Sequence, residues 1–271
     1  MIIKCVEIVA FYGGIIIYIM KITGLKWESE NVTFEHYKPM EKKTNSAVLI
    51  FPGGAYVGHA DHEGQGYAEM FNSWGMNAFV LKYSVMPNYF PKPLLDARRA
   101  IRWIRSKAEE LGIDKNQILV MGSSAGGHLA SMLSTYTQAL EGEETEVAEE
   151  DFLPNGQILC YPVVSSDDEI GHMGSYIHLL GDRFYDKRKV DPIRLAKEST
   201  PKAFIWHTST DSVVNVVNSY HYAEALANKN VTCELHVYPI GEHGSGRAEF
   251  MPYIAKWTQC LEDWLKLNQY L

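Results

Sequence analysis

Ser124 lies at the centre of a G-x-S-x-G pattern that runs from Gly122 to Gly126. An apolar stretch precedes the pattern and a helical one follows it, which predicts a tight strand-to-helix turn that presents the serine above a sheet. The two glycines allow close backbone packing, and the start of the following helix offers the N–H of Ala125 to a developing oxyanion. This arrangement is typical of a nucleophilic serine, with an ordinary Gly/Ser-rich loop as the alternative.

A nucleophilic serine needs a histidine base and a carboxylate that orients it. Asp211 and His243 each follow an apolar run, in the segments HTSTDSVV and GEHGSG. Both therefore fall at the carboxyl ends of predicted strands, where the sites of parallel sheets form. We predict His243 as the base and Asp211 as the acid, and Asp167 or Asp168 would supply the acid in a shifted variant.

The segment PGGAY after an earlier apolar run offers backbone N–H groups. A tetrahedral intermediate needs such donors preorganised around its oxyanion. We predict that Gly53, Gly54 and Ala55 form this loop, with Gly54 and Ala55 as the first candidates, and that Ala125 completes the oxyanion hole. A plain type II turn is the alternative.

Other polar residues have weaker contexts. His207 is predicted to be structural, and His128 to support the loop from the nucleophile helix. A polar cluster of four residues has no metal-ligand spacing and is predicted to be a solvated loop or helix start near the site mouth. Its members are His59, Asp61, His62 and Glu63. Serine chemistry needs no metal, and we expect neither a metal nor another cofactor.

Continuous apolar runs alternate with helical patterns along the chain, which indicates an α/β protein with a mostly parallel sheet covered on both faces. Strands are predicted over residues 47–51, 77–83, 117–121, 157–164, 202–207 and 233–238, and helices over 93–111, 125–136, 217–229 and 253–267. Two segments look inserted: the acidic residues 141–151 are predicted to be a solvated loop, and residues 165–200 a small cap.

The bulk properties fit one domain over residues 1–271. A net charge of −8 argues against a broad nucleic-acid surface. The four cysteines show neither a disulfide framework nor zinc spacing, which weakly favours a reducing compartment and a cytoplasmic location. Homo-oligomerisation is left open.

Residues 1–26 are the least typical part of the chain. The apolar run at residues 8–20 is shorter than a transmembrane helix, and its β-branched residues and two glycines suit a strand or core segment. We expect a soluble N-terminal segment that does not associate with a membrane. The alternative is a secretion signal, which would imply a secreted protein.

With these motifs, the chain resembles the esterase/lipase group of α/β-hydrolases, particularly the bacterial acetyl-xylan-esterase-like enzymes and their hormone-sensitive-lipase-like relatives. The matching blocks span roughly residues 48–246 and are PGGAY (52–56), LKYSV (81–85), DARRAIRWIR (96–105), GSSAGGHLAS (122–131), CYPV (160–163), HTSTDSVV (207–214) and GEHGSG (241–246).

The resemblance implies the α/β-hydrolase fold, with Ser124, Asp211 and His243 as nucleophile, acid and base. It places the oxyanion donors at Gly54, Ala55 and Ala125. Related lipases carry H-G-G-G where this chain has Pro52 to Ala55, and the proline resembles the carbohydrate-esterase side of the family.

The expected function is a serine carboxylic-ester hydrolase. It would deacetylate small or carbohydrate acetyl esters, such as acetylated sugars, through an acyl-enzyme. A peptidase or arylformamidase with the same triad is one alternative, because nothing in the triad separates ester from amide cleavage. A binding protein on an inactive hydrolase scaffold is another.

Overall fold

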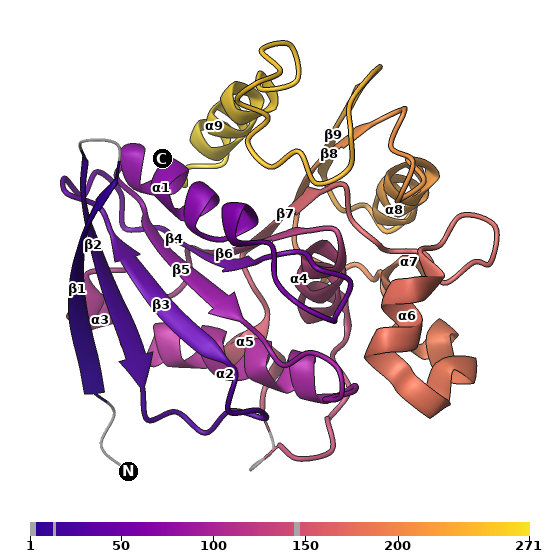
Figure 1. Ribbon diagram of the computed structural model, residues 1–271, viewed down its shortest axis with the longest axis horizontal. Helices are drawn as coiled ribbons and strands as arrows, with labels where there is room; N and C mark the ends of the chain where they lie inside the picture. Colours follow the sequence, from indigo (N-terminus) through magenta and orange to yellow (C-terminus); the bar gives the residue numbers. More distant parts are fainter. Residues whose placement is uncertain (1–3, 13–14, 144–146) are drawn as a thin grey trace.

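The computed structural model describes residues 4–12, 15–143 and 147–271. Within them, nine strands form one sheet in the order β1-β2-β3-β5-β4-β6-β7-β8-β9 (Figure 1). The strands are β1 (Lys4–Tyr12), β2 (Ile15–Thr23), β3 (Thr33–Lys38), β4 (Ala47–Phe51), β5 (Asn77–Lys82), β6 (Ile118–Ser123), β7 (Gly156–Cys160), β8 (Ala203–Thr208) and β9 (Cys233–Tyr238). Neighbours from β5 to β9 pair in parallel, and β1 to β3 join β5 in antiparallel fashion. The predicted mostly parallel sheet is confirmed.

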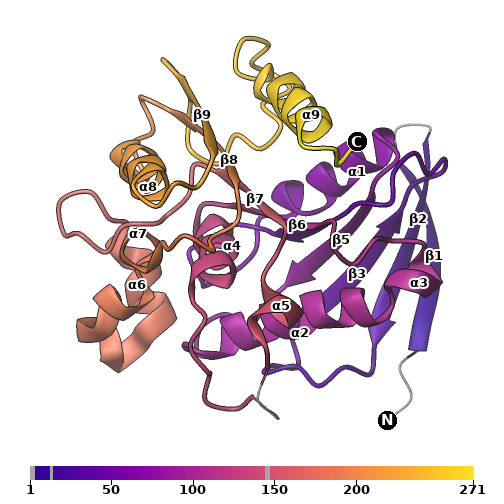
Figure 2. The same ribbon diagram turned by 180° about the vertical axis from the view of Figure 1, so that it is seen from behind.

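Helices cover both faces of this sheet (Figures 1 and 2). One face packs against α1 (Gln65–Ser73) and α9 (Trp257–Leu267), and the other against α2 (Lys92–Ser106), α4 (Ala125–Thr135) and α8 (Val217–Ala227). Alternate residues of β4 divide between the two cores: Leu49 and Phe51 face α2 and α4, whereas Val48 and Ile50 face α1 and α9. A strand buried on both faces reads as a continuous apolar run, which is why its sequence was recognisable.

Two predicted helices differ from the structure: the last one begins at Trp257, four residues later than predicted, and an earlier one is interrupted. The pattern over residues 93–111 is divided at Lys107 into α2 and the short α3 (Ala108–Leu111). Gly112 then ends α3 in the left-handed conformation, with φ 65°. A glycine adopts this conformation without the steric penalty of a Cβ atom, so the predicted stop at this residue is confirmed.

The apolar run near the N-terminus falls in β1 and β2. These strands pair in antiparallel register, with Tyr12 opposite Ile15, and β2 joins the sheet by pairing with β3. The interpretation of this run as strand is confirmed, while Gly13 and Gly14 lie outside the described residues. No helix in the described part of the chain is long and apolar enough to cross a membrane.

The segment between β7 and β8 contains α6 (Met173–Leu180), η2 (Gly181–Val190) and α7 (Pro192–Leu195), drawn in orange in Figure 1. His128 of α4 links this segment, at Val190, to the loop after β4. The Nε2 atom of His128 donates to the carbonyl of Val190 at 2.8 Å, and its Nδ1 atom accepts from the hydroxyl of Tyr56 at 2.7 Å. The prediction that His128 supports this loop agrees with these contacts.

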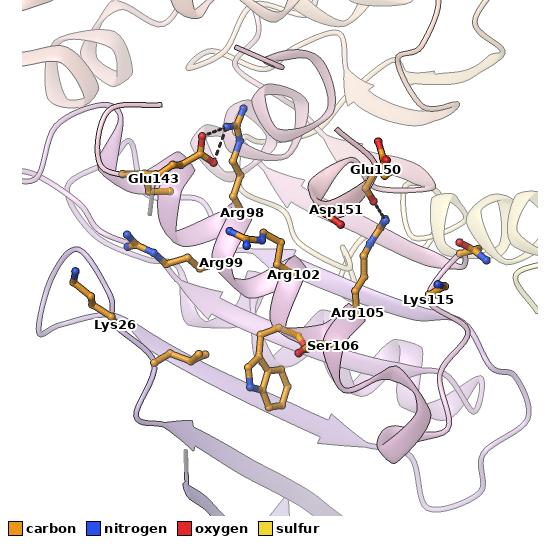
Figure 3. Close-up of a pocket in the computed structure, with 14 residues that line it drawn as sticks. Lys26, Arg98, Arg99, Arg102, Arg105, Ser106, Lys115, Glu143, Glu150 and Asp151 are labelled. Carbon is orange, nitrogen blue, oxygen red and sulfur yellow. Dashed lines mark hydrogen bonds and ion pairs between the residues drawn. The ribbon is translucent and has the colours of Figure 1, made fainter. Parts of the chain in front are cut away.

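A cavity of about 760 Å³ lies along α2, apart from the residues predicted to be catalytic (Figure 3). Two of its arginines contact an anion or carbonyl oxygens: Arg98 forms an ion pair with Glu143 at 2.8 Å, and Arg105 donates to the carbonyls of Glu150 and Leu153. Glu143 belongs to the acidic segment that was predicted to be solvated. That prediction is wrong at Glu143, whose side chain is nearly buried, because the buried Arg98 guanidinium requires a counter-charge. Further along the segment, α5 (Glu149–Phe152) forms another part of the wall.

We predict that His128 makes folding stability dependent on pH. Burial lowers the pKa of His128 from 6.5 to about 4, and this outweighs the opposing effects of the Val190 carbonyl and the Asp191 charge. Because the folded-state pKa is depressed, the contribution is fully present above about pH 6.5 and is lost as the pH falls toward 4. The loss is on the order of 3 kcal/mol.

Urea unfolding of the wild type and of His128→Gln between pH 7.5 and 4.5 tests this prediction. The stability of the variant should fall less on acidification. Burial lowers the pKa of His36 and His59 in the same way, so the difference between the two proteins isolates the contribution of His128. His221→Gln, at an exposed position of α8, is the control and should follow the wild type. Parallel curves for wild type and His128→Gln would contradict the prediction.

Candidate active site

Ser124 lies between β6 and α4, in the strained conformation φ 53°, ψ −119°. The two glycines of the motif make this turn sterically feasible. A Cβ atom at Gly122 would lie 2.1 Å from the carbonyl oxygen of Gly126, and one at Gly126 would lie 2.0 Å from that of Phe51. The backbone approaches itself and β4 too closely for any side chain at these positions. Strain of this kind persists only where the surrounding structure enforces it, and it commonly marks active sites.

The structure brings together Ser124, His243 and Asp211. The Nε2 atom of His243 lies 2.9 Å from Oγ of Ser124, and its Nδ1 atom lies 2.6 Å from Oδ2 of Asp211. Because a carboxylate accepts, Nδ1 carries the hydrogen in neutral His243 and Nε2 is left to accept from the serine hydroxyl. These are the contacts that serine activation requires.

Asp211 is held by four donors and its side chain is fully buried. Its Oδ1 atom accepts from the N–H groups of Val213 and Val214 at 2.9 and 2.8 Å, and its Oδ2 atom accepts from His243 and, at 3.1 Å, from Nε2 of His207. Burial alone would raise the pKa of Asp211, but hydrogen bonds from His207 and His243 together with the nearby His243 charge hold it well below its usual range. The carboxylate therefore remains ionised beside the imidazole.

Sequence reasoning missed the contact of His207 with this acid. His207 is buried in β8, as expected of a structural histidine, and it also lies within hydrogen-bond distance of the hydroxyl of Ser219 and the carbonyl of Val214. Its position at the end of the strand that leads to Asp211 was the available signal.

The loop after β4 lies beside the nucleophile turn and has unusual backbone conformations. Gly54, Ala55 and Tyr56 have φ values of 136°, 51° and 60°. In the described part of the chain, no protein acceptor is found for the N–H groups of Gly54 and Ala55. Ala125 is the first residue of α4, so its N–H has no partner within the helix.

Gly53 differs from the prediction. Its N–H donates to Oε2 of Glu63 at 2.8 Å and is therefore already engaged. An N–H with a charged acceptor at this distance is not available to an oxyanion. The structure leaves Gly54, Ala55 and Ala125 as the candidates for an oxyanion hole.

The alternative acid Asp168 and the polar cluster around Glu63 make other contacts than those of a catalytic acid or a metal site. Asp168 is 81% exposed and forms an ion pair with Lys187, whereas the carboxylate that contacts His243 is that of Asp211. In the cluster, Asp61 is exposed and pairs with Lys82, as a solvated position would. The 3-10 helix η1 (Asp61–Glu63) leads into α1, as the predicted helix start would, but Glu63 is only 2% exposed, so the prediction of a solvated position is wrong there. Within the described ranges, no group of His, Cys, Asp and Glu side chains is arranged to hold a metal ion.

Comparison with known proteins places these features in a family. The BD-FAE family model matches residues 34–226. An endo-1,4-beta-xylanase B of Butyrivibrio fibrisolvens is 37% identical over 204 residues, which make up 73% of this chain and 32% of that protein. An acetylxylan esterase of Xylanibacter ruminicola is 32% identical over 233 residues, 83% of this chain and 46% of that protein. The chain thus spans less than half the length of these two curated relatives.

Solved structures match over most of their length. The acetyl ester-xyloside bifunctional hydrolase from Caldicellulosiruptor lactoaceticus is 37% identical, with a TM-score of 0.81, and the match covers 90% of this chain and 95% of that one. Esterase 2 of Thermogutta terrifontis, phosphonylated by sarin, is 26% identical with a TM-score of 0.76, over 91% and 94% of the two chains. The family match, the sheet and the strained serine turn agree: the chain belongs to the BD-FAE family and has the α/β-hydrolase fold.

Proposed function

We propose that the chain is a serine esterase that removes acetyl groups from small or carbohydrate esters. The observation that carries the proposal is the continuous hydrogen-bonded chain from Ser124 through His243 to Asp211. The relatives support an ester substrate, since one is named an acetylxylan esterase and another an acetyl ester-xyloside hydrolase.

In the proposed mechanism, His243 takes the proton of Ser124 as the serine oxygen attacks the ester carbonyl. Asp211 stabilises the imidazolium that forms and keeps it oriented. The N–H groups of Ala125, Gly54 and Ala55 stabilise the negative charge on the carbonyl oxygen. His243 then protonates the leaving alcohol, and an acyl-enzyme remains. Water, activated by the same histidine, attacks the acyl-enzyme and releases the acid.

The segment at residues 165–200 is proposed to act as a small cap on a single domain. One contact supports this role. His178 of α6 lies with its Nδ1 atom 2.9 Å from the carbonyl oxygen of Ala55, in the loop of candidate oxyanion donors. A cap this short favours acetyl over long acyl groups.

Replacement of Ser124 by alanine tests the nucleophile. Turnover of p-nitrophenyl acetate should fall by roughly 10⁴-fold or more, because no other group can form the acyl-enzyme. Labelling by a fluorophosphonate probe should disappear with it. Ser131→Ala is a matched control, since its hydroxyl lies further along α4 and donates to the carbonyls of Gly127 and His128. Unchanged turnover in Ser124→Ala would reject the assignment, and a wild type that the probe does not label would favour an inactive binding protein.

The identity of the acid is tested by two equivalent substitutions. Asp211→Asn should lower kcat by about 10⁴-fold, because an amide neither holds the required histidine tautomer nor stabilises its cation. Asp168→Asn, at the exposed rival position, should retain wild-type kcat. The reverse order of the two effects would assign the acid to the earlier segment.

The substrate class is tested by a panel of acyl compounds. The value of kcat/KM for p-nitrophenyl esters should fall by at least about tenfold from acetate to octanoate, because a short cap leaves little room for methylene groups. Acetylated xylose and xylan should be deacetylated. A maximum at octanoate would contradict the preference for acetyl groups, and faster cleavage of aminoacyl amides or of N-formylkynurenine would instead indicate a peptidase or an arylformamidase.

A further inference from the structure

Glu63 is a buried carboxylate next to the proposed site, and no step of the proposed mechanism uses it. Its Oε2 atom lies 2.8 Å from the N atom of Gly53, and its Oε1 atom lies 2.7 Å from the hydroxyl oxygen of Tyr161. A nearly inaccessible carboxylate is costly to bury unless donors satisfy it. Both oxygens therefore depend on these donors, and the donors come from different parts of the chain.

The direction of each hydrogen bond follows from groups that can only donate. The N–H of Gly53 donates to Glu63, and the N–H of Gly246 donates to the hydroxyl oxygen of Tyr161 at 2.9 Å. The hydroxyl of Tyr161 also lies 3.2 Å from that of Tyr67, but Oε1 of Glu63 is the nearer acceptor at 2.7 Å and, as a carboxylate oxygen, the stronger one, so the hydrogen of Tyr161 points at Glu63. An uninterrupted chain of hydrogen bonds thus runs from Gly53 through Glu63 and Tyr161 to Gly246.

One end of this chain fixes the loop of candidate oxyanion donors. Residue Gly53 is held on both sides by the same segment, since its carbonyl accepts from the N–H of Ala60 at 2.9 Å while its N–H donates to Glu63. A Cβ atom at Gly53 would lie 2.5 Å from Oε2 of Glu63 and 3.2 Å from Cβ of Ser124. Glu63 and the nucleophile are therefore separated by this one glycine.

The other end fixes residues 241–246, the loop that carries His243. Besides the Tyr161–Gly246 contact, Nε2 of His62 donates to the carbonyl of Gly244 at 2.9 Å. The ring of Tyr161 also packs edge-on against the ring of His243, with 5.0 Å between their centroids. His62 and Tyr161, the sequence neighbour and the partner of Glu63, thus contact the loop at two residues that follow the proposed base.

We propose that Glu63 is a positioning residue: its carboxylate fixes the oxyanion-donor loop and the His243 loop relative to each other. This inference rests on the proposed esterase function. Oxyanion donors act only at about 2.7–3.1 Å from the developing charge. A displacement of about 1 Å in a catalytic group can cost on the order of 100-fold in rate.

Glu63→Gln tests the proposal with little change in shape. Gly53 and Tyr161 donate to different oxygens of the carboxylate, and in the amide one of these two positions is an NH₂ group that cannot accept. We expect kcat for p-nitrophenyl acetate to fall about 10- to 100-fold while KM stays within about threefold, because positioning in the transition state is impaired rather than substrate binding. The second-order rate of fluorophosphonate labelling of Ser124 should fall in parallel. Rates are expressed per active site titrated to completion with the probe, and the melting temperature reports folding.

Asp61→Asn is the matched control, with the same change of carboxylate to amide in the same turn, at an exposed position. It should keep wild-type kcat. A second variant, Tyr161→Phe, removes the hydroxyl that links Glu63 to Gly246 and should reproduce the fall in kcat. Because both residues belong to one chain of contacts, kcat of the double variant should be little lower than kcat of the more impaired single variant.

Wild-type kcat and labelling rate in Glu63→Gln would overturn the inference, as would an equal loss in Asp61→Asn. If Glu63→Gln does not fold, Tyr161→Phe decides: an unchanged kcat overturns the proposal, and a loss at unchanged KM supports it. A wild type that neither hydrolyses esters nor reacts with the probe would overturn the proposed function, and this inference with it. An active wild type with an equally active Glu63→Gln overturns the inference alone.

Discussion

The contact of the serine turn with the end of β4 is the constraint on which the rest of the site depends. In the sheet register, Phe51 lies opposite Gly122, so β4 and β6 end at the same level. Gly126 lies against the carbonyl of Phe51 with no room for a side chain. The loop that follows β4 must therefore emerge directly beside Ser124. Hydrogen-bond donors on that loop can serve the serine only because two glycines permit this approach.

Buried charge is the second constraint, and the two buried carboxylates meet it differently. Asp211 is surrounded by backbone N–H groups and two imidazoles, which keep it ionised. Glu63 is held by one backbone N–H and one phenol. Burial raises the pKa of Tyr161 well above 10, and the Glu63 charge adds to the effect, so the phenol keeps its hydrogen for the carboxylate. Neither carboxylate relies on a lysine or arginine.

The sequence predicted best what depends on local pattern. The strands over Ala47–Phe51 and Cys233–Tyr238 match their predicted bounds, and the first is a continuous apolar run that stops at Pro52-Gly53-Gly54. Chain order and position at strand ends singled out the three side chains that the structure brings together. The β7 strand stops at Cys160, earlier than predicted, because Tyr161 adopts a left-handed φ of 37° that an apolar pattern does not reveal.

What the sequence could not predict depends on long-range contacts. Glu63 was interpreted as part of a solvated loop or helix start because its cluster has no metal-ligand spacing, and its partner Tyr161 is 98 residues away. Gly53 was assigned to the oxyanion donors because its type and place fit, but that assignment could not foresee Glu63 as its acceptor. The contact of His207 with Asp211 also was not predicted. Three residues separate the two along the chain, and a turn brings their side chains together.

The attachment of α6 to the loop after β4 also has a consequence for how the proposed esterase can diversify. His178 contacts the carbonyl of Ala55, whose own N–H is a candidate donor to the oxyanion. A substitution that shifts α6 would therefore also move the loop of candidate oxyanion donors, so in the proposed esterase changes in this segment and changes in rate would be coupled.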